Sequence, residues 1–196
     1  MSALPSATTL PRQPQRRPGV KFFVVFFFAL FTVGASLHAW PTTAQWLPVY
    51  RGGAIVYDSN TDTNGSRNIV GSTASPSLYL FNDGINLYFR LRLDSSPAGT
   101  GGQGLLQSFG WGVIFDTNMV ATDFEWLIMV DCIDKNESIL LEHNTVQGTI
   151  NDPGDKTAAI VYTLGLAGNY QISVADTAFN GDQDYFLDWR LPYDVL

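Results

Sequence analysis

Apolar residues occur along most of the chain in short segments of β-branched and aromatic side chains, separated by clusters of Gly, Pro, Asn and Asp. No amphipathic segment with helical periodicity extends beyond two turns, so the pattern predicts an all-β protein. Regularly spaced segments of this kind are typical of an antiparallel β-sandwich of jelly-roll or immunoglobulin-like type, here with about nine strands. The predicted strands are 54–58, 77–81, 86–94, 109–117, 123–133, 137–143, 157–164, 169–175 and 184–191.

The clearest feature is a hairpin between segments 77–81 and 86–94, with the turn Asn82-Asp83-Gly84. Asp-Gly supplies the positive φ angles that a tight hairpin turn requires. The second strand alternates with a period of two, which predicts one face in the core and the other in solvent. The core face carries Leu87, Phe89, Leu91 and Leu93, and the other face carries Tyr88, Arg90, Arg92 and Asp94.

Segments 109–117 and 123–133 carry large apolar residues on both alternating faces. This pattern indicates strands that are covered on both sides, so we expect them to be central in their sheet.

The N-terminal segment differs in charge from the rest of the chain. All 18 acidic residues follow position 40, whereas Arg12, Arg16, Arg17 and Lys21 precede the apolar run 22–35, which is followed by small residues. This order is typical of a secretory signal peptide. The run is short compared with the roughly 20 apolar residues that span a bilayer, so a cleaved signal is favoured and a retained membrane anchor is the alternative.

The chain is therefore divided into a signal peptide at 1–39, a linker at 40–52 and a β-sandwich module at 53–196, with a secreted or cell-envelope location. After residue 39 there are 7 basic and 18 acidic residues, a net charge of −11 that would repel nucleic acid. The one cysteine, Cys132, has no partner for an internal disulfide and is interpreted as a buried apolar residue on a strand.

Three stretches carry a resemblance to known proteins: NIVGSTASPSLYLFNDGINLYFRLRLD, WGVIFDTN with DFEWLIMVD, and DYFLDWRLP. Together they resemble the family-9 carbohydrate-binding modules, the related DOMON domains and a group of bacterial surface modules. These are strand and turn signatures, so the resemblance implies a fold far more than a function. It also implies closing strands after Pro192 that this sequence does not contain, so we expect a C-terminally truncated module; the alternative is that the domain ends there.

The sequence after residue 39 contains few candidate catalytic residues. His143 is the one histidine there, and no pair of acidic residues is singled out by its spacing. The usual Ser-His and Cys-His arrangements therefore have few candidate residues, and we predict a noncatalytic protein.

The sequence requires no cofactor, and a hard cation such as Ca²⁺ is the candidate that it favours. Asp58, Asn60, Asp62 and Asn64 alternate oxygen ligands with spacer residues, as a cation-binding loop does. The alternative is an Asx-rich surface loop whose side chains cap its own turns. A second acidic turn, Asn180 to Asp184, has the same two interpretations.

Sugar binding requires exposed aromatic rings with polar neighbours. The candidate ligand-binding residues are Tyr88, Arg90, Arg92, Trp111, Trp126 and Trp189. The alternative is that the tryptophans lie in the core and that the arginines pair across strands.

The sequence thus predicts a secreted or cell-surface noncatalytic β-sandwich module with a structural, adhesive or ligand-binding role. The alternative is a carbohydrate-binding module with a calcium-stabilised loop. The expected partners are a glycan or another surface protein, and a membrane only through an uncleaved N-terminal segment.

Overall fold

Antiparallel strands form the folded part of the chain in the computed structural model, which describes residues 39–99, 104–120, 124–133, 137–145 and 159–196. Apart from Ala39, the predicted signal peptide lies outside the described residues. No helix in these ranges is long and apolar enough to cross a membrane. The strands are β1 (Leu47–Pro48), β2 (Tyr50–Arg51), β3 (Ala54–Ile55), β4 (Leu78–Asn82), β5 (Asn86–Leu93), β6 (Gly110–Phe115), β7 (Trp126–Asp131), β8 (Ser138–His143), β9 (Ala159–Gly165), β10 (Tyr170–Val174) and β11 (Tyr185–Pro192); the 3₁₀ helices are η1 (Thr43–Gln45), η2 (Gly65–Arg67), η4 (Phe179–Gly181) and η5 (Tyr193–Val195).

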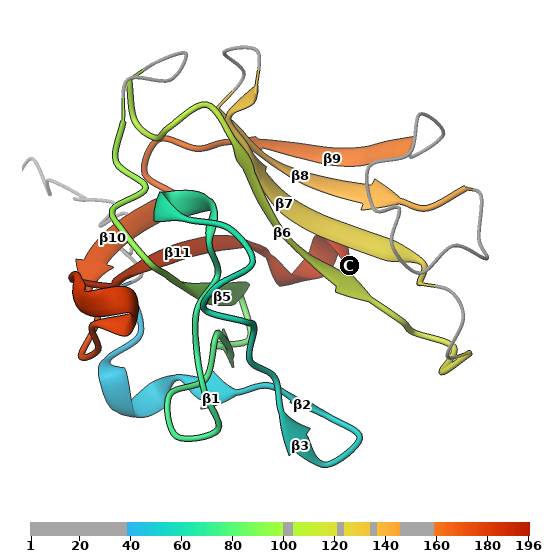
Figure 1. Cartoon of the computed structure of the whole chain (residues 1–196). Helices are drawn as coiled ribbons and strands as arrows, with labels where there is room; N and C mark the ends of the chain where they lie inside the picture. The colour runs from blue at the N-terminus through green and yellow to red at the C-terminus, as the bar shows by residue number, and fades with distance from the viewer. Residues whose placement is uncertain (1–38, 100–103, 121–123, 134–136, 146–158) are drawn as a thin grey trace, which may run out of the picture. The chain divides into compact units, whose positions relative to one another are not determined.

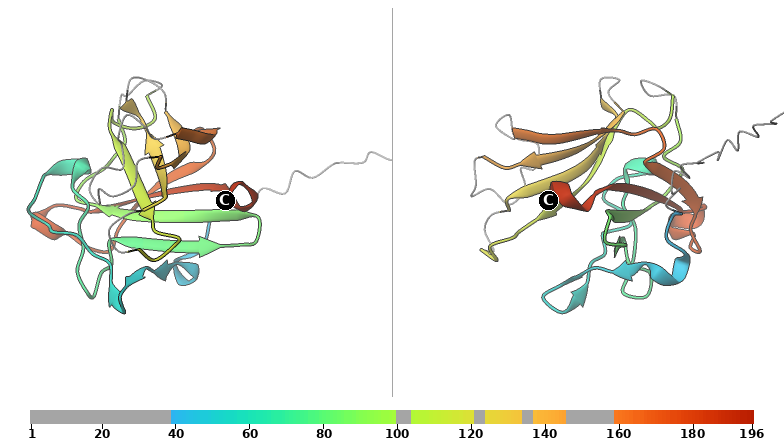
Figure 2. Two further views of the ribbon diagram at one scale, coloured as in Figure 1. Left: turned by 90° about the vertical axis from the view of Figure 1, so that its right-hand side faces the viewer. Right: turned by 180° about the vertical axis from the view of Figure 1, so that it is seen from behind.

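Two antiparallel sheets form the layers of the predicted β-sandwich (Figures 1 and 2). One sheet has the strand order β1-β4-β5-β11-β10, and the other has the order β6-β7-β8-β9. Strands β2 and β3 form a separate short ribbon. Each of the nine predicted strand segments overlaps one of the strands β3 to β11, so the all-β prediction is confirmed.

A single apolar core joins the two sheets. The five-stranded sheet contributes Phe89 and Leu91 of β5 and Leu187 and Trp189 of β11, all at most 3% exposed. The four-stranded sheet contributes residues of β6, β7 and β8, among them Trp111, Val113, Ile128, Val130, Ile139 and Leu141. Burial of these side chains supplies the main driving force that holds the layers together.

The predicted hairpin is confirmed as β4 and β5. The Asp83 carboxylate accepts hydrogen bonds from the backbone N–H groups of Ile85 and Asn86, at 2.8 and 2.7 Å. Gly84 has a φ of 85°, which is the left-handed conformation that glycine adopts without strain. Strand register follows, with Phe89 opposite Leu80 and Arg90 opposite Tyr79.

The outer face of β5 is buried, which corrects the prediction that it faces solvent. Tyr88, Arg90, Arg92 and Asp94 are 0%, 7%, 2% and 4% exposed. The period of two is right, but both faces are covered because polar side chains can be buried when they are paired.

Two further predictions are corrected. Residues 40–52 are not a linker, because they belong to the same compact unit as the rest of the sandwich and β1 pairs with β4. Strand β6 is not central: it is an edge of its sheet among the described strands, and Ile114 on its outer side is 42% exposed. Strand β7 does lie between two neighbours, as predicted.

Two isoleucines on neighbouring strands test the position of the core. Ile128 of β7 is fully buried, whereas Ile114 of β6 is 42% exposed. We expect Ile128→Ala to lower the free energy of unfolding by about 3 kcal/mol, because it leaves a cavity. Ile114→Ala is the matched control and should cost less than about 1 kcal/mol. Urea denaturation of both variants measures the difference, and equal losses would contradict the core described above.

Candidate functional site

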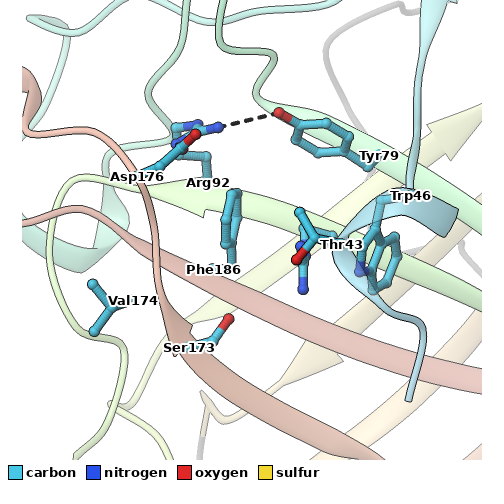
Figure 3. Close-up of a pocket in the computed structure, with 9 residues that line it drawn as sticks. Thr43, Trp46, Tyr79, Arg92, Ser173, Val174, Asp176 and Phe186 are labelled. Carbon is cyan, nitrogen blue, oxygen red and sulfur yellow. Dashed lines mark hydrogen bonds and ion pairs between the residues drawn. The ribbon is translucent and has the colours of Figure 1, made fainter. Parts of the chain in front are cut away.

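A pocket of about 300 Å³ lies over the outer face of the five-stranded sheet, and Figure 3 shows the side chains around it. Its walls come from segments that are far apart in the sequence. They are Thr43 and Trp46 at η1, Tyr79 of β4, Arg90 and Arg92 of β5, Ser173 and Val174 of β10, Asp176, and Phe186 of β11. We call this site the outer-face pocket.

Arg90 is held from three sides. Its Nε and Nη2 atoms donate to the two carboxylate oxygens of Asp188 at 2.7 and 2.8 Å. Its guanidinium carbon lies 4.3 Å from the ring centroid of Trp46 and 4.3 Å from that of Phe186. A planar guanidinium suits this arrangement, because its edge forms a bidentate ion pair while its faces stack on aromatic rings.

Local structure explains why these groups meet. Strands β5 and β11 are paired so that Arg90 lies opposite Asp188, and both point to the outer face. Gln171 of β10 also donates to Asp188, at 2.7 Å. Trp46 reaches the same place because the turn of η1, closed by a 3.0 Å hydrogen bond from Gln45 N–H to the Thr42 carbonyl, directly precedes β1.

Arg92 places a second guanidinium group on the same face of the sheet. Its Nη1 donates to Asp176 at 2.9 Å and to the Thr177 hydroxyl at 2.5 Å, and its Nη2 donates to the Tyr79 hydroxyl at 3.1 Å. Arg92 is buried, whereas the side chain of Asp176 is 82% exposed. The hydrogen bond from Arg92 lowers the pKa of Asp176, so this carboxylate is ionised at neutral pH.

The outer-face pocket therefore offers hydrogen-bond donors and acceptors beside apolar rings. Among the described residues, Nη1 of Arg90 has no acceptor, and Arg90 lines the pocket. Asp176 provides an exposed acceptor, and Thr43 and Ser173 provide hydroxyl groups. Such a combination binds small polar molecules with several hydroxyl groups.

The structure brings together only Arg90 and Arg92 of the six predicted ligand-binding residues. Trp111 and Trp189 are 1% and 0% exposed; Trp111 donates to the Ser66 carbonyl at 2.8 Å, and Trp189 stacks on Phe89. These two rings are core residues, so their selection as exposed stacking residues is corrected.

Tyr88 and Trp126 also lie outside the pocket lining. Tyr88 is fully buried and donates to Asp83 at 2.9 Å, and burial raises the pKa of its hydroxyl. Trp126 is half-buried on β7, in the other sheet, and its ring lies 4.7 Å from that of His143. Both side chains are engaged in contacts within the domain.

Trp46, Tyr79 and Phe186 were missed as site residues. The sequence pattern could have identified Phe186, because strand alternation places it on the face opposite to the core residues Leu187 and Trp189. Trp46 had no such signal, since it lies in a segment without strand periodicity. Its position is decided by packing on Arg90.

In the described structure, two residues of the predicted metal loop accept hydrogen bonds from backbone N–H groups. The Asp58 carboxylate accepts a hydrogen bond from Ser59 N–H at 2.8 Å, and the Asn60 side-chain oxygen accepts one from Gly71 N–H at 3.0 Å. Asp62 and Asn64 are exposed, and Asn64 directly precedes η2. Asp58 thus accepts from its own loop, as in the Asx-loop alternative, whereas Asn60 accepts from Gly71, which lies outside that loop.

Comparison of the chain with protein-family models, with curated proteins and with solved structures finds no match.

The two ion pairs of the outer-face pocket differ in burial, which separates their contributions to stability. We expect Asp188→Asn to lower the free energy of unfolding by about 3 kcal/mol, because it leaves the Arg90 charge buried without a counterion. Asp176→Asn changes the exposed partner of Arg92 and should cost less than about 1 kcal/mol. Urea denaturation measures both, and the reverse order would contradict the assigned geometry.

Cys132 is fully buried, as predicted, and burial together with the Glu137 and Asp131 carboxylates raises the pKa of its thiol to about 12. Because the thiolate is the reactive form, we expect no reaction with a disulfide reagent in the native protein at about pH 8. Reaction should appear in urea in parallel with unfolding. Rapid labelling of the native protein would show that Cys132 is accessible.

Proposed function

We propose that this chain is a secreted or cell-surface noncatalytic module that binds carbohydrate in the outer-face pocket. The proposal depends on one observation: Arg90 is fixed between Trp46 and Phe186 while its Nη1 has no acceptor among the described residues. A donor that is held rigid before binding loses little conformational entropy when it meets a ligand.

The hydrogen-bonding groups of the pocket match sugar hydroxyls, each of which donates and accepts. Arg90 can donate to a hydroxyl oxygen, and the exposed Asp176 carboxylate can accept from a hydroxyl hydrogen. The half-buried side chains of Tyr79 and Phe186 add apolar surface beside these polar groups.

Charge favours a neutral glycan over a polyanionic one. The chain after residue 39 has a net charge of −11, and each pocket arginine is paired with an aspartate. Long-range repulsion would therefore oppose a highly sulfated or phosphorylated polymer. The basic and apolar N-terminal segment supports export to a compartment where glycans occur.

A bulky residue at Ser173 tests the pocket. Ser173 lines it from β10, and its hydroxyl has no hydrogen-bond partner among the described residues, so Ser173→Phe fills the space without breaking a contact. We expect isothermal titration with neutral oligosaccharides to show binding by the full chain. The variant should weaken that binding more than about tenfold, a loss of about 1.4 kcal/mol.

Thr163→Phe is the matched control, since Thr163 is exposed on β9 of the other sheet. This variant should bind as the unmodified chain does. Equal losses in both variants, or no glycan binding by the unmodified chain, would refute the proposal and favour a structural or adhesive role.

A further inference from the structure

Two buried side-chain oxygens near the end of β5 have no hydrogen-bond donor. They are Oδ1 of Asn68 and Oδ1 of Asp184, and both residues are 0% exposed. A buried acceptor without a partner destabilises the folded state, and more so when it is charged. Two such atoms in one region therefore call for a physical explanation.

The segments that carry these two residues lie on either side of Asp94, the residue that follows β5. On one side, the Asp94 N–H donates to the Asn68 carbonyl at 3.0 Å. On the other side, β11 pairs with β5 so that Tyr185 lies opposite Leu93. Continuing this register by one residue places Asp184 opposite Asp94, so the three side chains come from adjacent segments.

Two asparagines close the same region. The Asn180 side-chain amide donates to Oδ1 of Asp94 at 2.8 Å and to the Asn60 carbonyl at 2.6 Å. The Asn68 amide donates to the same Asn60 carbonyl at 3.1 Å. Phe179 N–H donates to Oδ2 of Asp184 at 3.1 Å, which leaves Oδ1 of that carboxylate without a donor.

Charge makes the arrangement more costly still. Asp94 and Asp184 are 4% and 0% exposed, and neither forms an ion pair within the described part of the chain. Two neighbouring buried carboxylates repel each other, and like charges directly opposite on paired strands are destabilising. A bound cation would remove both the repulsion and the missing hydrogen bonds.

We propose that Asp94, Asp184 and the side-chain oxygen of Asn68 bind one Ca²⁺ ion. Every available ligand is an oxygen, two of them from carboxylates, which is the donor set that Ca²⁺ prefers. Among the described residues, no three His, Cys, Asp or Glu side chains gather in a metal-binding cluster. The site therefore combines two carboxylates with an amide oxygen, and it differs from the predicted Asp58–Asn64 loop.

The test is Ca²⁺ titration of the EGTA-treated full chain by calorimetry, with thermal melts in EGTA and in Ca²⁺. We expect one bound Ca²⁺ and a melting temperature that rises with Ca²⁺ concentration, since a ligand of the native state stabilises it. Asp184→Asn and, separately, Asp94→Asn should weaken Ca²⁺ binding by more than about tenfold, because even residues that only support a metal ligand affect affinity by that factor.

Asp62→Asn and Asp194→Asn are the matched controls, since both residues are exposed aspartates outside the site. Both should bind Ca²⁺ as the unmodified chain does. Absence of Ca²⁺ binding and of any Ca²⁺-dependent stabilisation in the unmodified chain would overturn the proposal. Buried water would then be the expected hydrogen-bond donor to the two side-chain oxygens. Loss of binding in Asp62→Asn with retention in Asp94→Asn would also overturn it. The measurement involves no glycan, so it is independent of the function proposed above.

Discussion

The ion pair between Arg90 and Asp188 connects the two neighbouring strands β5 and β11 on the outer face of the five-stranded sheet. A buried pair is tolerated only if its remaining hydrogen-bonding groups and faces are satisfied. Gln171 donates a further hydrogen bond to the Asp188 carboxylate, while Trp46 and Phe186 cover the Arg90 guanidinium. This requirement explains why the segment before β1 packs on the sheet, and it creates the pocket between that segment and β10.

On the outer face of β5, three polar side chains each donate to an aspartate, and the pairs are Tyr88 with Asp83, Arg90 with Asp188, and Arg92 with Asp176. Asp94, which follows β5, differs, because continuing the register of β5 and β11 by one residue places it opposite another carboxylate, Asp184. The candidate glycan pocket and the proposed Ca²⁺ site are thus two parts of one buried polar face.

Sequence periodicity predicted where the strands lie far better than what covers them. Alternation in β5 correctly separated Phe89 and Leu91 from Arg90 and Arg92, because strand geometry sets which side chains share a face. It failed to predict that the polar face is buried. Arginines look solvent-exposed when their ion-pair partners are about 84 to 98 residues away in the chain. The apolar pattern of β6 was likewise consistent with a central strand, although Ile114 is exposed.

By itself, the sequence determined the all-β class, the positions of the strands and the hairpin at Asp83-Gly84, because these depend on local backbone preferences and on a period of two residues. Only the tertiary structure decided that Trp46 packs on Arg90, that Trp111 and Trp189 lie in the core, and that Asn60 meets Asn180. These contacts join segments distant in the chain, and burial and charge pairing select them after the strands have assembled.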